Sequence, residues 1–193
     1  MKKLYFLFFY SFITTVAPAQ NYASFTQVGP VKFPDDPSIQ TTGMGRVSQL
    51  AYHPTDSNII FAVTASGGVF KSSNEGISWR PITDFLPQTS CASLAINPLN
   101  PKVMYLGTGD ANYNGGGLGV WKTNDGGNSW FQFTTGLGNK LVSYIIFSPI
   151  DTSTLIAACY DGIYKTTDAG NNWIKKTTVN SSYRDLKYRA GSN

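Results

Sequence analysis

The sequence has little of the chemistry on which many enzymes and metal sites depend. Its 193 residues include one histidine, His53, and two cysteines, Cys91 and Cys159. A transition-metal centre built from His and Cys would therefore have too few ligands. A nucleophile–His–acid arrangement is equally unsupported, because His53 precedes Pro54 at a predicted turn. Two cysteines can form at most one disulfide, and their spacing does not indicate that they pair. We expect no metal and no cofactor.

Charged residues are also scarce, at 13% of the chain, and they are not clustered. The 15 Lys and Arg exceed the 11 Asp and Glu by four, but these cations are spread along the sequence, whereas a nucleic-acid footprint needs a basic patch. Beyond residue 20, no apolar run reaches the roughly 20 residues that a membrane-spanning helix needs. We therefore expect neither nucleic acid nor a membrane span.

The amino terminus has the pattern of a signal peptide. Lys2 and Lys3 precede an apolar run at 4–16, and Ala17-Pro18-Ala19 follows it. We predict that residues 1–19 are removed after Ala19 and that the mature chain, 20–193, is secreted or displayed at the cell surface. Cleavage removes two lysines and no acid, which leaves a charge of 13 − 11 = +2.

One twelve-residue motif occurs three times in the chain. It reads GVFKSSNEGISW at 68–79, GVWKTNDGGNSW at 119–130 and GIYKTTDAGNNW at 162–173. A related apolar stretch with a proline at its fifth place precedes each copy. Such spacing is typical of a repeat architecture. We assign the units to 44–86, 88–137 and 139–180.

Each unit is predicted to contain four short strands. In the first unit they are expected at 47–52, 59–64, 68–71 and 79–82. These runs are rich in β-branched and aromatic residues and are separated by turn residues. Helical periodicity is absent, and several runs are apolar on both faces, which favours sheets packed between other sheets. The pattern predicts an all-β fold: a β-propeller of four-stranded antiparallel blades, about three of which are present as an open arc.

The three motif copies resemble Asp-boxes, also called BNR repeats, which occur in propellers of sialidases, xyloglucanases, sortilin and the photosystem II assembly factor. The matching residues are Ser72, Asn74, Gly76, Trp79, Thr123, Asp125, Gly127, Trp130, Thr166, Asp168, Gly170 and Trp173. The first copy departs from the pattern, since Asn74 replaces the carboxylate. We interpret the boxes as structural turns in which the acid accepts backbone N–H groups, the glycine permits positive φ and the tryptophan covers the turn. One carboxylate per turn supplies too few oxygen ligands for calcium, so we do not expect the boxes to bind it.

Both ends of the sequence resemble parts of units. SFTQVGPV at 24–31 is similar to the stretch after each motif, and DLKYRAGSN at the end is similar to QLAYHPTDSN at 49–58. We therefore predict that 183–193 begins a further blade. Because three blades cannot surround a channel, we expect an amino-terminal fragment whose partners include missing carboxy-terminal blades of the same chain.

Candidate ligand residues lie in the loops predicted at the end of the sheets opposite the boxes. They are Arg46, Asp110, Asn112, Tyr113, Asn114, Tyr160 and Asp161. Several come from the insertion DANYNGG at 110–116, which offers acceptors, amide donors and a ring able to stack on a sugar. The alternative is that this Gly-rich insertion is only a loop.

Glycoside hydrolysis needs two carboxyl groups flanking one bond. Xyloglucanases similar to this pattern carry a catalytic aspartate within a stretch like RTDIGGAY, but here VTASGGVF at 63–70 places Ala65 at that position. We expect a secreted, non-catalytic scaffold that binds a glycan or an extracellular or surface protein. One alternative is the amino-terminal part of a sialidase- or xyloglucanase-like hydrolase with catalytic residues beyond this stretch. Another is an assembly or sorting factor similar to the photosystem or sortilin propellers. The leader and boxes also resemble type IX secretion cargo.

Overall fold

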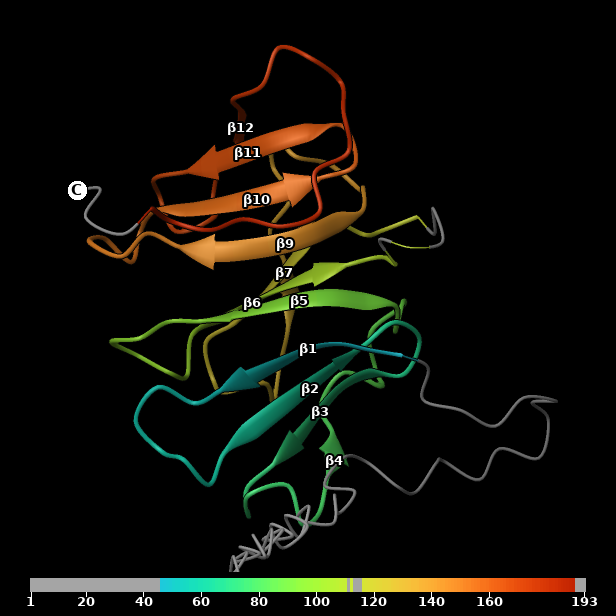
Figure 1. The fold of residues 1–193 in the computed structure, drawn as a ribbon, viewed down its shortest axis with the longest axis vertical. Helices are drawn as coiled ribbons and strands as arrows, with labels where there is room; N and C mark the ends of the chain where they lie inside the picture. Colours follow the sequence, from blue (N-terminus) through green and yellow to red (C-terminus); the bar gives the residue numbers. More distant parts are fainter. Residues whose placement is uncertain (1–45, 111, 113–115, 190–193) are drawn as a thin grey trace, which may run out of the picture.

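A computed structural model describes residues 46–110, 112 and 116–189, and within those ranges all regular secondary structure is β. Twelve strands form three four-stranded antiparallel sheets, each joining strands consecutive in sequence, and Figure 1 shows the sheets following one another along the molecule. The strands are β1 (Val47–Tyr52), β2 (Ile60–Thr64), β3 (Gly68–Ser72), β4 (Arg80–Pro81), β5 (Cys91–Ile96), β6 (Met104–Thr108), β7 (Val120–Thr123), β8 (Phe131–Gln132), β9 (Val142–Phe147), β10 (Leu155–Cys159), β11 (Gly162–Thr166) and β12 (Ile174–Lys175). The predicted partial β-propeller is confirmed.

The first strands of the three sheets pack against one another, β1 on β5 and β5 on β9 (Figure 1). The Gln49 side chain ties β1 to β5, since its Nε2 donates to the Leu94 carbonyl at 3.3 Å and its Oε1 accepts the Leu94 N–H at 2.7 Å. In the same way, the Ser93 hydroxyl on β5 accepts the Ile145 N–H from β9 at 3.2 Å. The third residue of a first strand therefore joins neighbouring sheets.

Two apolar cores lie between the sheets. Phe61, Val63 and Val69 of the first sheet pack with Leu106 of the second, whereas Tyr105, the preceding residue of β6, belongs to the core shared with the third sheet. Successive side chains of a strand point to opposite faces, so β6 needs apolar residues at every position when both its faces are covered. This is why the repeat contains apolar runs without alternation.

The three sheets share one pattern of strand pairing. Cys91 lies opposite Thr108, and Cys159 lies opposite Val142, as Val47 lies opposite Thr64 in the first sheet. Both cysteines are free and fully buried, in different cores. Burial raises the pKa of each thiol to about 12, with a further contribution from the Asp161 charge at Cys159.

The fourth strand is shorter than predicted. It was expected at 79–82 but spans Arg80–Pro81, and the fourth strands of the other two sheets are equally short. The Ile82 N–H still bonds the Val69 carbonyl at 2.9 Å, so the chain stays alongside β3. The predicted leader and the predicted strand at 24–31 lie outside the described residues.

The repeated motif forms the turn between the third and fourth strands of each sheet; these turns, at 72–79, 123–130 and 166–173, are called motif turns below. The Thr166 hydroxyl accepts the Gly170 N–H at 3.0 Å, and Asp168 Oδ1 accepts the Asn172 N–H at 2.9 Å. Gly170 has φ +86°, which favours glycine. The other two turns repeat these bonds, and in the first Asn74 Oδ1 accepts the Ser78 N–H at 2.9 Å.

The motif tryptophans differ in what their indole N–H groups bond. Trp79 Nε1 donates to the Gly76 carbonyl of its own turn at 2.9 Å. Trp130 Nε1 instead reaches the Ile82 carbonyl at 3.2 Å, and the Trp130 ring is part of the core between the first two sheets. Thus the second motif also fastens its sheet to the preceding one, a role that the predicted covering of the turn did not include.

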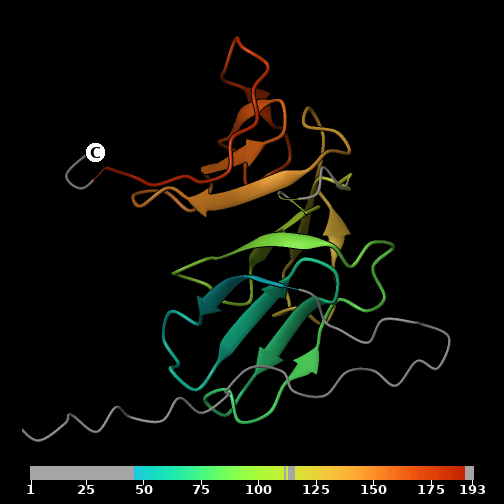
Figure 2. The same ribbon diagram turned by 45° about the vertical axis from the view of Figure 1, so that its right-hand side comes forward.

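The segment after β12 returns alongside β9 (Figures 1 and 2). The Tyr183 N–H donates to the Cys159 carbonyl at 3.1 Å, and the Tyr188 side chain hydrogen-bonds Ser148. The segment therefore runs in the same direction as β9, next to it, as β9 runs next to β5. Residues 176–189 contain no strand, so a further blade starting at 183 stays a prediction.

Candidate functional site

The two ends of the sheets carry different groups of turns. Ser72 lies opposite Ile60, which puts the motif turns at one end, called the motif end. Val47 lies opposite Thr64, so Arg46 and the turns that join second to third strands lie at the other end, called the hairpin end. The β6–β7 turn with Asp110 and the β10–β11 turn with Tyr160 and Asp161 are also at the hairpin end.

Each first strand has a β-bulge at its second residue. In β1, Val47 pairs with Thr64 and Gln49 with Val63, which leaves Ser48 as the extra residue. The same shift occurs in the other sheets, at Ala92 in β5 and Ser143 in β9. A bulge locally redirects a side chain and often lies beside a functional site. The three bulges therefore lie at equivalent positions at the hairpin end.

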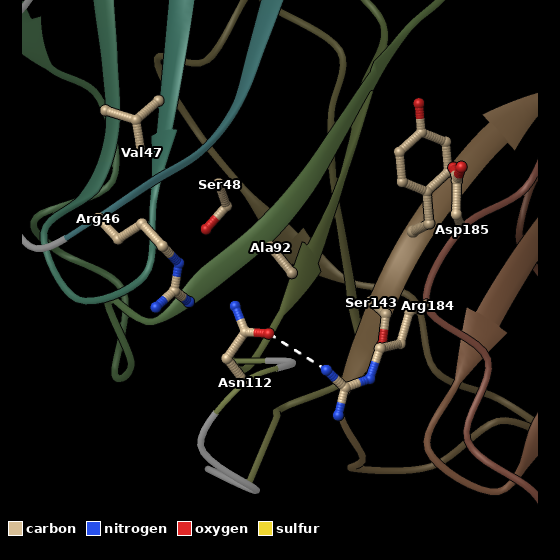
Figure 3. A pocket seen from close by; sticks show the side chains of 9 residues that line it. Arg46, Val47, Ser48, Ala92, Asn112, Ser143, Arg184 and Asp185 are labelled. Atoms are coloured by element: carbon tan, nitrogen blue, oxygen red, sulfur yellow. Dashed lines mark hydrogen bonds between the residues drawn. The ribbon is translucent and has the colours of Figure 1, made fainter.

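A pocket of about 390 Å³ lies where these bulges meet (Figure 3). It is lined by Arg46, Val47, Ser48, Ala92, Asn112, Ser143, Tyr144, Arg184 and Asp185. Its volume is within the range of small-molecule sites in proteins. Arg184 precedes the DLKY stretch as Ser48 precedes QLAY, so the pocket takes this position from all three units and from the segment that follows them.

A chain of polar contacts crosses this pocket. Arg46 Nη2 lies 2.6 Å from Asp110 Oδ1, an ion pair in which the Asp110 side chain is 13% exposed. The same Oδ1 accepts the Asn112 N–H at 2.9 Å, and Asn112 Oδ1 accepts a bond from Arg184 Nη1 at 3.2 Å (Figure 3). The guanidinium groups of two different units are thus held in place by the β6–β7 turn.

Ser143 stands out among the pocket residues because its hydroxyl has no hydrogen-bond partner among the residues that the structure describes. The residue is 5% exposed, and its Oγ is fully buried. Buried polar atoms are nearly always hydrogen-bonded in folded proteins, and an exception calls for a physical explanation. Since Ser143 also lines the pocket, a group inside the pocket can supply the partner.

A second polar cluster lies around Asp161. Its Oδ2 accepts bonds from Lys140 Nζ at 2.8 Å and from the Tyr164 hydroxyl at 3.0 Å, and Lys175 Nζ is 3.7 Å away. Burial alone would raise the pKa of Asp161, but these hydrogen bonds and the two lysine charges outweigh it and lower the pKa. The carboxylate therefore stays ionised and anchors the β10–β11 turn to the linker before β9.

The structure brings three predicted ligand residues together and leaves others apart. Arg46, Asp110 and Asn112 lie at the pocket or in its polar network. Asp161 belongs to the separate cluster, and Tyr160 is 57% exposed and does not line the pocket. Tyr113 and Asn114 lie outside the described residues.

Sequence reasoning missed the pocket's central residues, Ser143 and Arg184. Both are at the repeat position of Ser48, so aligning the units would have grouped them. Nothing in the alignment shows that Ser143 is the extra residue of a bulge, which places it at the pocket, and Arg184 lies there without being in a strand.

Other kinds of site find no support in the part of the chain that the structure covers. There, no three His, Cys, Asp or Glu residues are grouped so that they could hold a metal ion. His53 has a turn role, as predicted: its Nδ1 accepts the Thr55 N–H at 3.4 Å, as Asn97 Oδ1 accepts the Leu99 N–H at 2.9 Å. Nor do the described residues include a helix long and apolar enough to cross a membrane.

Comparison with known sequences finds partial relatives. No family model matches the chain. A probable oligoxyloglucan-reducing end-specific xyloglucanase of Neosartorya fischeri is 32% identical over 77 residues, which are 37% of this chain and 9% of that enzyme. The oligoxyloglucan-reducing end-specific xyloglucanase of Emericella nidulans is 28% identical over 76 residues, again 9% of its length. The chain thus spans less than a tenth of these curated relatives in each match.

Solved structures give the same picture. An ancestral GH74 enzyme matches 68% of this chain with 18% of its own, at a TM-score of 0.59 and 27% identity. The GH74 xyloglucanase of Xanthomonas campestris matches 68% of this chain with 20% of its own, at 0.55 and 20% identity, and this likeness concerns the fold alone. The three sheets are therefore arranged like a section of the GH74 β-propellers.

Proposed function

We propose that this chain forms blades of a β-propeller glycoside hydrolase whose substrate is a xyloglucan-type β-glucan. The observation that carries the proposal is the agreement of two comparisons: the 32% identity with a xyloglucanase sequence and the fold shared with an ancestral GH74 enzyme at 27% identity. The short matched share of those proteins supports a longer protein with further blades, since three sheets cannot close a ring.

In this proposal the hairpin end binds the polysaccharide. Its pocket offers serine hydroxyls, an amide, two guanidinium groups and the half-buried Tyr144, which is the mixture of polar groups and aromatic surface that suits a sugar. The two carboxyl groups that glycoside hydrolysis needs are not assigned to these blades. Ala65 occupies the place where similar xyloglucanases have an aspartate, so the acid and its partner would come from other parts of the protein.

A non-catalytic glycan- or protein-binding scaffold is the second candidate, and Ala65 is the observation that favours it. The residue is 7% exposed, and its N–H is bonded to the Arg46 carbonyl at 2.9 Å. A methyl group at this position supplies neither a proton nor a nucleophile. If no other blade supplies a carboxylate pair, the propeller would bind its ligand without cleaving it.

Turnover decides between the two candidates. The product of the complete reading frame would be incubated with xyloglucan, with carboxymethyl cellulose and with mannan, and released oligosaccharides would be separated by chromatography. Release from xyloglucan in preference to the other two is the expected result. If the protein retains xyloglucan without releasing oligosaccharides, the scaffold is established. If it neither retains nor cleaves any of the three polysaccharides, the glycan assignment is wrong.

The motif turns and the leader extend the proposal. We assign the three turns to the Asp-box class, supported by the paired Thr and Asp bonds around Gly127 and Gly170. The Lys2, Lys3 and Ala19 pattern supports export and a place outside the cell or at its surface. Likeness to sortilin and to type IX secretion cargo stays a proposal that rests on those motifs alone.

A further inference from the structure

In the first strands, the bonds between sheets are made by the residue that follows the bulge and not by the bulged residue itself. The third residues of the first strands, Gln49 and Ser93, make the bonds that join one sheet to the next. The second residues, Ser48, Ala92 and Ser143, are left unpaired by the bulges and line the pocket instead. The repeat thus separates a scaffold position from a pocket position.

The buried hydroxyl of Ser143 shows what kind of group the pocket lacks. A hydroxyl can donate one hydrogen bond and accept others. Because Oγ itself is fully buried, the Ser143 side chain must rotate about its Cα–Cβ bond for its hydroxyl to meet an occupant of the pocket, and a partner reaching this 5%-exposed residue must be a small group. A hydroxyl of a sugar ring meets this requirement, because it too can donate and accept.

The charges around the pocket favour a neutral occupant. Arg46 is already paired with Asp110 at 2.6 Å, and the pocket lining contains Asp185 as well as Arg184. Arg46, Arg184, Asp110 and Asp185 sum to zero, and Lys187, which lies 3.6 Å from Asp185, is outside the pocket lining with its side chain 83% exposed. An anionic ligand would have to compete with Asp110 for Arg46, whereas a neutral polyol can bond the free edges of the same groups without displacing a carboxylate.

From these observations we infer that the pocket holds one neutral sugar residue of a polysaccharide chain, with a ring hydroxyl bonded to Ser143 Oγ. Asn112 and Arg184, which are bonded to each other at 3.2 Å, face the same occupant from the β6–β7 turn and the returning segment (Figure 3). Tyr144 is also among the residues that line the pocket. The inference rests on the proposed function and names the residue that reads the sugar.

The test is a pair of measurements on Ser143→Ala in the product of the complete reading frame. Titration calorimetry with xyloglucan, cello- and manno-oligosaccharides would measure binding, and thermal melting without ligand would measure stability. We expect the best neutral oligosaccharide to bind about five- to tenfold more weakly, the loss of one hydrogen bond. The melting temperature should stay the same or rise, because the hydroxyl removed has no partner.

Two matched variants complete the design. Ser93→Ala should lower the melting temperature instead, because it removes the acceptor of the buried Ile145 N–H. Ser48→Leu fills the pocket from its opposite side at an exposed position that tolerates a larger side chain during folding, and it should abolish oligosaccharide binding.

Unchanged binding of every neutral oligosaccharide by Ser143→Ala would overturn the inference, as would binding confined to oligogalacturonate, sialyllactose or an acidic peptide. These outcomes are separable from failure of the proposed function. Cello-oligosaccharide binding that depends on Ser143 without xyloglucan turnover would keep the inference and reject the hydrolase. If Ser143→Ala changes neither xyloglucan turnover nor oligosaccharide binding, the hydrolase is kept and the inference about Ser143 is rejected.

Discussion

Trp173 Nε1 donates a 3.0 Å hydrogen bond to the backbone carbonyl of Phe133, which follows β8 in the preceding sheet. The Trp173 ring is 2% exposed and belongs to the core between the second and third sheets. The backbone N–H of Trp173 donates to the Thr135 carbonyl at 2.9 Å. One residue of the repeated motif therefore ties two sheets together through its backbone, its indole N–H and its ring.

Replacing this tryptophan should loosen the sheets. We expect Trp173→Phe to lower the free energy of unfolding by about 1–3 kcal/mol, because it leaves the Phe133 carbonyl without its donor and removes buried ring area. Urea denaturation of the full-length protein measures the change. Trp130→Phe should cost about the same, whereas a larger loss for Trp79→Phe, whose indole bonds its own turn, would contradict the inter-sheet role.

The buried hydroxyl of Thr123 should be essential to its turn. It accepts the Gly127 N–H at 3.0 Å and donates to Asp125 at 2.7 Å, and the residue is 0% exposed. Thr123→Val keeps the shape but leaves a buried N–H without an acceptor, so we expect it to cost about 1–3 kcal/mol. The midpoints of urea denaturation of the two proteins would measure this loss of stability. Thr123→Ser retains the hydroxyl and should be nearly as stable as the original; equal losses for both variants would argue against the hydrogen bond.

Stability should fall in acid because of Asp168. Its bonds from the Asn172 side chain, the Asn172 N–H and the Thr166 hydroxyl hold its pKa at about 2 in the folded protein, against an ordinary 3.8. A depressed folded pKa gives stability that is present above the ordinary value and is lost as pH falls toward the folded one. The unfolding midpoint should therefore drop between about pH 4 and pH 2.

Asp168→Asn is the control for that prediction. It copies the first motif, where Asn74 accepts the equivalent N–H, so the variant should fold. Its unfolding midpoint should depend less on pH between about 4 and 2. An unchanged pH dependence would assign the acid sensitivity to other carboxylates.

Both thiols should be unreactive in the folded protein. Cys91 and Cys159 are fully buried, and burial raises the pKa of each thiol to about 12, so almost no thiolate forms at neutral pH. A disulfide-exchange reagent such as Ellman's should release colour only after urea is added. Rapid reaction of one thiol under native conditions would show that its core opens locally.

The repeat predicted most of the scaffold because the same constraint acts three times. The strand at 47–52 and the turn at 166–173 follow from an apolar run and from aligning the repeated motifs. The indole bond of Trp173 could not be predicted, since sequence similarity among motifs does not show which backbone carbonyl an N–H will meet. The pocket could not be predicted for a related reason. A bulge depends on how strands pair, and in the sequence Ser143 looks like any small residue at the start of a strand.

The division of labour between second and third residues of the first strands has a consequence for how ligand preference can change. Ser48, Ala92 and Ser143 differ at one repeat position that lines the pocket, while the neighbouring Gln49 and Ser93 make the bonds that join the sheets. Point substitutions there can alter the pocket one unit at a time while the fold persists. Duplicated repeats thus give evolution, or an engineer, a set of independently variable sites around a single ligand.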